Sequence, residues 1–458
     1  MAYFNLDPLL VKKYNQALPR YTSYPTVPFW SDQINKQSWE AAFSKQFGIQ
    51  NNTKGISLYV HLPFCESLCT YCGCNKRITT NHKVEEEYLA VIKREWHLYR
   101  ELMPETPVIR EIHLGGGTPT FFSESNLKRL VSTLLESSII HPKHEFSIEG
   151  HPNNTTREHL QTLYSLGFRR ISYGVQDNDP AVQRVINRIQ PLENVRKATE
   201  NARSVGFNSV NFDLIYGLPL QTLSSIEKTI REVIELAPDR IAFYSYAHVP
   251  WTSKGQRLFD ETHLPAAEEK INLYLKGREL LLKNNYRDVG MDHFALPHDA
   301  LYEAKVNNTL HRNFMGYGTQ NSGLLLGLGV SAISDLGNSF AQNEKSLHEY
   351  YDSIAQGQLA VKRGYFLNEE DLAFRKYILD ISCKGTTTFN PCHVPLLQEF
   401  TFPVLRELAE DGLIEYDETH LKATALGHYF IRNICSAFDL YLQRNQSNDK
   451  KQVFSKAI

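Results

Sequence analysis

The chain has 458 residues, of which 42% are hydrophobic and 22% are charged, and its formal net charge is −2 at pH 7. This length allows two or three domains, and the composition is that of an ordinary globular protein rather than a disordered or fibrous one. The near-neutral charge gives no reason to expect a nucleic acid as partner. Because four of the seven cysteines lie in one short loop and no signal peptide or membrane span is apparent, we expect a cytoplasmic protein.

Residues 1–50 are predicted to form an N-terminal arm with little regular structure. Within it, the segment Pro19–Thr26 reads PRYTSYPT, and its prolines favour extended and turn conformations. The arm is either a strap on the surface of the main domain or a lid that brings Arg20 and tyrosines to a substrate pocket.

Residues 51–300 are predicted to form the core, because short β-rich segments alternate there with longer helical ones. A long crossover between strands requires parallel pairing, so this rhythm predicts an α/β fold with a parallel sheet. Six units are too few for a closed eight-fold barrel, and we predict an open, partial (β/α)6 barrel. The predicted strands are Ile56–Leu62, Val108–Leu114, Glu145–Gly150, Arg169–Val175, Ser209–Ile215 and Arg240–Ala247, and the predicted helices include Val84–Leu102, Glu124–Leu135, Glu193–Val205 and Ser224–Leu236.

A cysteine-rich loop follows the first predicted strand. Its sequence, CESLCTYCGC, places Cys65, Cys69 and Cys72 at the spacing CxxxCxxC and adds Cys74. Thiolates are the soft ligands that iron–sulfur clusters and zinc prefer, and three thiolates on a four-iron cluster leave one iron open to another ligand. A structural zinc site is less favoured, because it needs a second ligand pair and the chain has no second CxxC.

Polar or glycine-rich groups stand at the end of each of the other predicted strands. Ligands of such folds bind at the carboxyl ends of the strands, so these groups are expected to surround one site. In chain order they are Gly115–Thr120, Glu149, Gln176, Asp213 and Ala247–His248.

Residues 301–365 are predicted to be an extension that completes the active site, because the alternation of strands and helices stops after residue 290. The segments Gly290–Phe294 and Leu310–Phe314 are predicted to be loops that combine histidine, arginine and aromatic residues. The segment Gly327–Ile333 is predicted to be a strand or turn that passes close to another group.

Residues 366–458 are predicted to form a mostly helical C-terminal domain. It contains a predicted helix over Phe402–Glu410, a hairpin from Leu413–Tyr416 and His420–Ala423, and a helix over Leu426–Ile434. This order resembles a winged helix. With the near-neutral net charge, a docking or lid module is favoured over DNA binding.

Taken together, these motifs resemble the oxygen-independent coproporphyrinogen III oxidases, a family of radical S-adenosylmethionine enzymes, over nearly the whole chain. The resemblance is carried by PRYTSYPT, YVHLPFCESLCTYCGCNK, HLGGGTPT, YGVQD, NFDLIYGLP, GMDHFA, LHRNF, GLGVSAIS and IRNIC. It implies oxidative decarboxylation of two propionates of coproporphyrinogen III to vinyl groups, giving protoporphyrinogen IX in haem biosynthesis. A 5′-deoxyadenosyl radical, released from S-adenosylmethionine at a [4Fe-4S] cluster, would start this reaction.

The resemblance also assigns roles to residues. The cluster ligands, both metal-binding and catalytic in this scheme, would be Cys65, Cys69 and Cys72. Two S-adenosylmethionine molecules per chain are implied, the first contacting Tyr59, Gly116, Glu149 and Ile333, and the second Tyr71, Gly117, Thr118, Gln176, Arg188, Asp213 and Ala247. Cys74 would lie near the second molecule or the substrate. Because buried carboxylates need partners, we expect Arg20, Arg312 or both to contact the substrate propionates.

The family further implies a reduced flavodoxin- or ferredoxin-type electron donor, and we expect a monomer. The sequence departs from the family after Glu149, where Gly150-His151 replaces a short apolar–acidic or apolar–polar pair. The departure leaves open a related radical reaction on a tetrapyrrole, such as haem ring opening or methyl transfer. A haem chaperone that keeps the fold and the cluster without turnover is the alternative from a binding class.

Overall fold

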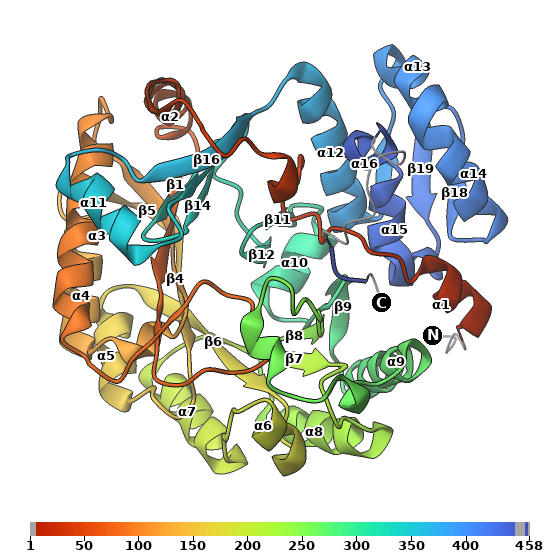
Figure 1. The fold of residues 1–458 in the computed structure, drawn as a ribbon, viewed down its shortest axis with the longest axis horizontal. Helices are drawn as coiled ribbons and strands as arrows, with labels where there is room; N and C mark the ends of the chain where they lie inside the picture. The colour runs from red at the N-terminus through yellow and green to blue at the C-terminus, as the bar shows by residue number, and fades with distance from the viewer. Residues whose placement is uncertain (1–5, 445–453, 457–458) are drawn as a thin grey trace.

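A twelve-stranded mixed sheet forms the centre of the protein (Figure 1), which a computed structural model describes over residues 6–444 and 454–456. Its strands in chain order are β1 (Ile56–Leu62), β4 (Val108–Gly116), β5 (Ile139–Gly150), β6 (Phe168–Gln176), β7 (Ser209–Tyr216), β8 (Arg240–Ser245), β9 (Arg287–Gly290), β10 (His293–Ala295), β13 (Leu325–Leu328), β14 (Ile333–Asp335), β15 (Ser339–Asn343) and β16 (Val361–Phe366). Across the sheet the order is β16-β15-β14-β13-β1-β4-β5-β6-β7-β8-β10-β9.

Six parallel strands, β1 and β4 to β8, form the middle of this sheet, as the alternation predicts. The helices between them lie along the outer, convex side (Figure 1): α3 (Val84–Glu101), α4 (Glu124–Leu135), α5 (Arg157–Ser165), α6 (Pro180–Val185), α7 (Leu192–Val205) and α8 (Leu223–Leu236). The predicted partial (β/α)6 barrel is therefore confirmed. The predicted start of β5 at Glu145 was too late, because the first half of this strand is exposed and lacks the apolar pattern of a buried strand.

The sheet continues beyond the six units on both sides. At one side β13 pairs with β1 in parallel and β14 to β16 follow antiparallel, and at the other side β10 and β9 pair antiparallel. The prediction of loops at Gly290–Phe294 and Leu310–Phe314 was wrong. The first segment contains the turn between β9 and β10, and the second contains β11 (His311–Asn313), which pairs with β12 (Gly316–Gly318). Strands of three or four residues are too short to show a period of two in the sequence.

The N-terminal arm contains two helices, α1 (Pro8–Tyr14) and α2 (Lys36–Gln50), so the prediction of little regular structure was wrong for these residues. The side chain of Asn35 accepts a hydrogen bond from the backbone N–H of Ser38 and caps α2. Trp39, Phe43 and Phe47, which are spaced four residues apart, bury one face of α2. Between the two helices, residues 18–26 run as an irregular strap.

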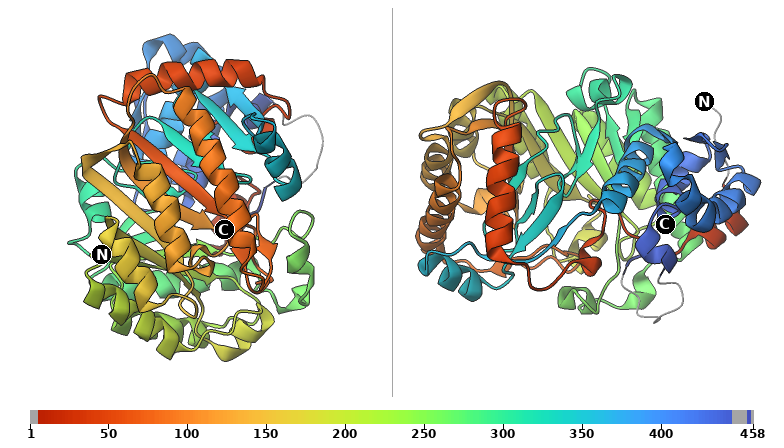
Figure 2. Two further views of the ribbon diagram at one scale, coloured as in Figure 1. Left: turned by 90° about the vertical axis from the view of Figure 1, so that its left-hand side faces the viewer. Right: turned by 90° about the horizontal axis from the view of Figure 1, so that it is seen from above.

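The C-terminal helices lie on the side of the molecule opposite α3 and α4 (Figure 2, right). They include α12 (Glu369–Lys384), α14 (Phe402–Glu410), α15 (Ile431–Ser436) and α16 (Leu440–Arg444), and they surround a small sheet of β17 (Thr386–Thr388), β19 (His420–Ala423) and β18 (Ile414–Tyr416). The predicted helix over Leu426–Ile434 is divided into a 3₁₀ turn, Gly427–Phe430, and α15. No helix among the described residues is long and apolar enough to cross a membrane.

Asp299 joins three elements at the amino-terminal end of the parallel strands. Its carboxylate lies 2.6 Å from Arg240 Nε on β8, accepts a hydrogen bond from Ser209 Oγ on β7 at 2.8 Å, and caps α10 (Ala300–Val306) through the N–H of Leu301. Both Arg240 and Asp299 are buried. The ion pair is therefore removed from water on both sides.

We expect Asp299→Ala to lower the free energy of unfolding by about 3–5 kcal/mol, because it leaves the Arg240 guanidinium buried and unpaired. Urea denaturation followed by circular dichroism measures this change. Glu86→Ala, which removes an exposed ion pair between α3 and Arg129 of α4, is the control and should leave the midpoint almost unchanged. Equal midpoint shifts in the two variants would contradict this account.

Candidate active site

The concave side of the parallel sheet lines a cavity of about 610 Å³. Successive residues of a strand point to opposite faces of the sheet, so one residue in two points into this cavity. The strand register sets these residues in rows, one of Tyr59, His113, Ser147 and Arg170, and another of Glu149, Ser172, Asn211 and Arg240. A parallel sheet with helices outside normally has apolar residues on both faces, so this polar inner face marks a binding site.

The cysteine loop lies at the carboxyl end of β1, where the sequence predicts it. It begins at β2 (Phe64–Cys65), which pairs with β3 (Arg77–Ile78) at the other end of the loop. Thr118 Oγ1 donates a hydrogen bond to Cys65 Sγ at 3.3 Å, and Arg188 Nη1 donates one to Cys69 Sγ at 3.7 Å. These donors favour thiolate sulfur, which is the form that binds metal.

The cysteine loop supplies three soft sulfur donors, Cys65, Cys69 and Cys72. The thiolates of an iron–sulfur cluster bind different irons, so they stand further apart than the ligands of a mononuclear zinc site. The soft donor set of Cys65, Cys69 and Cys72, with hydrogen-bond donors at two of its sulfurs, therefore fits a [4Fe-4S] cluster.

Glu149 brings a negative charge into the cavity next to the cysteine loop. Its Oε2 accepts a hydrogen bond from the N–H of Gly116 at 3.0 Å, and its Oε1 lies 3.3 Å from His113 Nε2. Burial alone would raise the pKa of Glu149, but the contacts with His113 and Gly116 hold this pKa below its usual value. An ionised carboxylate at this place suits a cationic ligand.

The four residues predicted for a first S-adenosylmethionine, Tyr59, Gly116, Glu149 and Ile333, all line this cavity. Tyr59 is held by His61, whose Nδ1 accepts from the tyrosine hydroxyl at 2.9 Å while its Nε2 donates to the carbonyl of Asn75 at 2.8 Å. Burial lowers the pKa of His61, so the imidazole is neutral and this tautomer orients the phenol. Gly116 has φ +119, and a Cβ there would lie 2.8 Å from the His61 ring.

Three residues predicted for a second S-adenosylmethionine lie around Gly174 of β6. Arg188 Nη2 donates to the carbonyl of Gly174 at 2.5 Å, and Asp213 of β7 is the register partner of Gly174. A Cβ at position 174 would lie 2.6 Å from Gln176 Nε2 and 3.0 Å from Arg188 Nη2, so a larger residue would displace these two side chains. The structure therefore brings Gln176, Arg188 and Asp213 together around Gly174.

Arg188 and Asp213 do not pair with each other. Asp213 accepts hydrogen bonds from Ser172 Oγ at 2.8 Å and Asn211 Nδ2 at 2.9 Å, whereas Nε of Arg188 is buried without a hydrogen-bond partner. Burial raises the pKa of Asp213 to about 6 despite these two donors. Both groups can therefore still bind a ligand of opposite charge. They could not do so if they formed a salt bridge with each other that only closed the end of the barrel.

The other residues of this second set adjoin the cysteine loop rather than the large cavity. Gln256 Nε2 donates to the carbonyls of both Tyr71 and Ala247, at 3.1 and 3.0 Å, and so joins the loop to the end of β8. Gly117 and Thr118 are bonded through their backbone N–H groups to the carbonyls of Leu62 and Phe64. Of the whole set, only Asp213 lines the 610 Å³ cavity.

The departure at Gly150-His151 changes the local packing. A Cβ at Gly150 would lie 2.9 Å from Thr155 Oγ1, so a larger residue would require the Thr155 side chain to move. The backbone N–H of His151 donates to Thr120 Oγ1, and burial together with the charge of Arg188 lowers the pKa of the His151 imidazole to about 3. The departure thus places a neutral imidazole near Arg188.

Two arginines predicted to bind the substrate, Arg20 and Arg312, line the same cavity. Arg20 Nη2 donates to the carbonyl of Ser245 at 2.7 Å, and Arg312 Nη2 donates to the carbonyl of Arg20 at 3.2 Å. Neither makes an ion pair with a carboxylate among the described residues, and Nε of Arg312 is buried without a partner. This part of the cavity therefore has positive charge to offer an anionic ligand.

Sequence reasoning missed most of the polar lining, namely His61, His113, Arg170, Arg240, Tyr244 and His293. Polar residues recur at every second position along the predicted strands, as in Tyr59 and His61 of β1, and this period could have found all of them except His293, whose strand is too short to show it. Burial, followed by the charge of Arg312, lowers the pKa of His293 to about 3, so this imidazole is neutral in the cavity.

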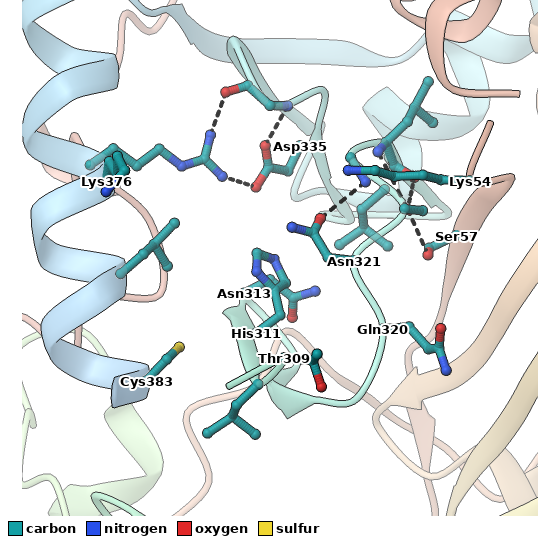
Figure 3. Close-up of a pocket in the computed structure, with 18 of the residues that line it drawn as sticks. Lys54, Ser57, Thr309, His311, Asn313, Gln320, Asn321, Asp335, Lys376 and Cys383 are labelled. Atoms are coloured by element: carbon teal, nitrogen blue, oxygen red, sulfur yellow. Dashed lines mark hydrogen bonds and ion pairs between the residues drawn. The ribbon is translucent and has the colours of Figure 1, made fainter. Parts of the chain in front are cut away.

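A second cavity, of about 520 Å³, lies at the amino-terminal end of β1 and β13 (Figure 3). The β11–β12 hairpin separates the two cavities, because His311 and Asn313 line this one while Arg312 lines the larger one. In contrast to Arg312, the Arg375 side chain here is paired, with Asp335 at 2.5 Å. The second cavity is also remote from the cysteine loop, so it lacks the elements of the site described above.

Comparison with known proteins places the chain among radical S-adenosylmethionine enzymes. Residues 59–233 match the model of the Radical SAM superfamily. The oxygen-independent coproporphyrinogen III oxidases of Escherichia coli strain K12 and Helicobacter pylori strain 26695 are 38% and 37% identical to it, covering 99% and 96% of this chain and 98% of each relative. The solved structure of coproporphyrinogen III oxidase from Escherichia coli, described as a radical SAM enzyme, matches with a TM-score of 0.89 at 37% identity, covering 96% of this chain and 100% of that one.

We expect Cys65→Ser, Cys69→Ser and Cys72→Ser each to lose the bound iron, because a serine oxygen is a harder ligand than a thiolate. Iron and acid-labile sulfide in anaerobically reconstituted protein measure this, with about four irons per unmodified chain. The exposed Cys392, changed to serine, is the control and should keep the full iron content. Full iron content in any of the three loop variants would contradict the assignment.

Proposed function

The chain belongs to the oxygen-independent coproporphyrinogen III oxidases of the radical S-adenosylmethionine superfamily, and we propose that it converts two propionates of coproporphyrinogen III to vinyl groups, giving protoporphyrinogen IX. The cavity of about 610 Å³ carries this proposal, because it joins two kinds of chemistry in one space. Glu149 and Cys74 line it next to the cysteine loop, and the unpaired Arg20 and Arg312 line it elsewhere.

The family implies a [4Fe-4S] cluster and S-adenosylmethionine, which together supply the radical that removes a hydrogen atom from a propionate. Cys65, Cys69 and Cys72 would hold the cluster. The ionised Glu149 offers a partner to the cationic end of the first S-adenosylmethionine, and Tyr59, fixed by the neutral His61, completes that wall. These residues bind and orient, and the reactive chemistry belongs to the cofactors.

Arg20 and Arg312 are proposed to hold the substrate propionates. A carboxylate removed from water is costly unless a charged donor meets it, and a guanidinium can meet it with two parallel hydrogen bonds. Holding the propionate fixes which carbon faces the cofactor, because the β-carbon lies two bonds from the carboxylate. After a hydrogen atom leaves this carbon, loss of CO2 and of one electron to an acceptor completes the vinyl group.

A second S-adenosylmethionine is proposed at the residues around Gly174. Arg188 has a free Nε for a carboxylate, and Asp213 can meet an amino group, and these are the two charged ends of a methionine moiety. The neutral His151 beside Arg188 adds no charge of its own to this subsite. Tyr71, Thr118 and Ala247 would close the subsite next to the cysteine loop.

The other segments are proposed to complete this site. Residues 301–365 supply Arg312 and Ile333 to the cavity wall. The C-terminal domain, residues 366–458, holds the arm of residues 1–50: Arg432 donates to the carbonyls of Leu18 and Pro19, the latter at 3.2 Å. Its proposed role is therefore to place Arg20 against the core of residues 51–300.

Anaerobic incubation with coproporphyrinogen III, S-adenosylmethionine and a reductant is expected to give protoporphyrinogen IX, measured by fluorescence after oxidation to the porphyrin. Arg20→Gln and Arg312→Gln should each lower product formation by about 10- to 100-fold, since a charge-assisted hydrogen bond contributes about 1.5–3 kcal/mol. Reductive cleavage of S-adenosylmethionine should remain measurable in both variants.

The control for these variants is Arg196→Gln on α7, whose guanidinium lies outside the cavity. An equal fall of cofactor cleavage and product formation would show that Arg20 and Arg312 are structural. A stable haem complex without conversion of the porphyrinogen would favour the haem chaperone, and consumption of haem would favour ring opening or methyl transfer.

Arg188→Ala and Asp213→Asn should keep the iron but lower bound S-adenosylmethionine from two per chain toward one, as measured by equilibrium binding. In the unmodified protein, the second molecule should bind less tightly at pH 5.5 than at pH 7.5. The reason is that Asp213, with its pKa near 6, takes up a proton and loses its attraction for a cation. Asp213→Asn should abolish this pH dependence. One molecule per unmodified chain at every pH would reject the second subsite.

A further inference from the structure

A chain of hydrogen bonds crosses the concave side of the sheet and ends on Glu149. Its members are Arg170 of β6, Ser147 of β5 and His113 of β4, and all of them line the cavity of about 610 Å³. His113 is the register partner of Ser147, and Ser147 is the register partner of Arg170, so the three side chains lie side by side on one face. Glu149 stands two residues after Ser147 on β5 and points to the same face. The parallel sheet therefore brings four polar groups into one row of contacts.

The first link fixes the direction of this chain. A guanidinium can only donate hydrogen bonds, and Arg170 Nη2 donates to Ser147 Oγ at 3.1 Å. Arg170 Nη1 lies 2.5 Å from Glu145 Oε1, and Thr319 Oγ1 donates to the same carboxylate at 2.6 Å. The ion pair with Glu145 thus holds the arginine in place. Because Ser147 Oγ accepts from Arg170, the hydroxyl can give its own hydrogen to another group.

The imidazole of His113 connects this hydroxyl to Glu149. Ser147 Oγ lies 2.8 Å from His113 Nδ1, and His113 Nε2 lies 3.3 Å from Glu149 Oε1. A ring nitrogen without a hydrogen would turn a lone pair toward the carboxylate, so Nε2 must carry a hydrogen and donate it to Glu149. Nδ1 then accepts from Ser147. The direction set at Arg170 therefore reaches Glu149 and selects one tautomer of the imidazole.

Neighbouring groups hold both partners of the last link. The His113 ring stacks on the ring of Tyr59, with centroids 5.9 Å apart and an angle of 19° between the planes. The N–H of Gly116 donates to Glu149 Oε2 at 3.0 Å. A Cβ at Gly115 would lie 3.0 Å from Glu149 Oε1, so glycine at this position lets the carboxylate lie close to the backbone. Each carboxylate oxygen thus accepts from a described group and has a further lone pair for a ligand.

We propose that Arg170, Ser147 and His113 are positioning residues that hold the Glu149 carboxylate for the amino group of the first S-adenosylmethionine. The inference rests on the proposed function, which assigns this carboxylate to the cationic end of that molecule. A carboxylate that is fixed before its ligand arrives loses little side-chain freedom on binding, and this increases the affinity. The three residues act on the ligand through Glu149.

Two substitutions of His113 distinguish the roles of its ring nitrogens. The amide nitrogen of glutamine reaches the position of Nε2, whereas that of asparagine, which is one methylene group shorter, reaches only the position of Nδ1. His113→Gln should therefore still donate to Glu149, and His113→Asn should contact Ser147 but lose Glu149. In the anaerobically reconstituted full-length chain, we expect the Kd of S-adenosylmethionine to rise about tenfold or more in His113→Asn and less than about threefold in His113→Gln.

Equilibrium dialysis with radiolabelled S-adenosylmethionine, without porphyrinogen, gives the Kd. The measurement is repeated in the Arg188→Ala background, where the second proposed subsite is disabled, so that the first molecule is observed alone. Iron content should stay at about four per chain in every variant, because none of the substituted residues supplies an iron ligand. His144→Asn, at the exposed beginning of β5, is the matched control and should leave the Kd unchanged.

Ser147→Ala tests whether the chain acts through His113. Alone, this substitution should raise the Kd by about three- to tenfold, because Nδ1 loses the donor that selects the tautomer. In the His113→Asn background, it should change the Kd by less than about twofold, because the contact with Glu149 is already lost. If the two substitutions only damaged the local structure independently, their effects would multiply instead.

Equal rises of the Kd in His113→Gln and His113→Asn, no rise in either, or multiplied effects of His113→Asn and Ser147→Ala would overturn the proposal. If the unmodified protein still converted porphyrinogen, such a result would leave the proposed function standing. The expected Kd values in a protein that does not convert porphyrinogen would support the hydrogen-bond chain and reject the proposed substrate.

Discussion

The alternation of side chains along parallel strands is the constraint on which the rest of this structure depends. With a period of two, each strand of the central sheet has one set of residues against the outer helices and another on the concave side. The outer set is apolar and fully buried, as in Leu58, Val60 and Ile112, and it supplies the core. The inner set is polar and lines a cavity where a closed barrel would have a packed interior. Stability and chemistry are therefore assigned to opposite faces of the same strands.

The arginines that line the cavity fall into two groups with different partners, and the two groups lie in different parts of the cavity. Arg170 and Arg240 are paired with Glu145 and Asp299, at 2.5 and 2.6 Å, at the amino-terminal end of the strands. Such pairs offset the cost of removing charge from water. Arg20 and Arg312 have backbone carbonyls as partners instead. The buried carboxyl group of Asp292 interacts electrostatically with both arginines, and hydrogen-bond donors such as Nε of Arg312 remain for a substrate carboxylate.

The sequence predicts the elements with strong periodicity and misses those without it. Strand β1, helix α4 and helix α14 have the predicted bounds, because their apolar patterns are long and end at clear boundaries. The short strands β9 to β12 carry too little pattern, since tertiary contacts stabilise them. Helix α2 was missed although its N-cap, Asn35, and the four-residue spacing of Trp39, Phe43 and Phe47 are visible in the sequence. For the site, the cysteine spacing predicts where a cluster would bind, and this stays a prediction. The four residues expected at the first cofactor all line the large cavity. The neutral imidazoles of His61 and His293 follow from burial, which spacing alone does not reveal.

The anchoring of the arm links the substrate pocket to the order in which the chain is made. Arg20 leaves the ribosome long before Arg312 and Arg432, the two residues that hold its segment through backbone carbonyls. Domains form from the N-terminus onward during synthesis, so the cysteine loop and its strands are complete while the strap still lacks its anchors. A nascent or prematurely terminated chain would thus have the cysteines for a cluster, but Arg20 and Arg312 would not yet be in place to hold a substrate. The substrate end of the cavity is therefore complete only in the finished chain.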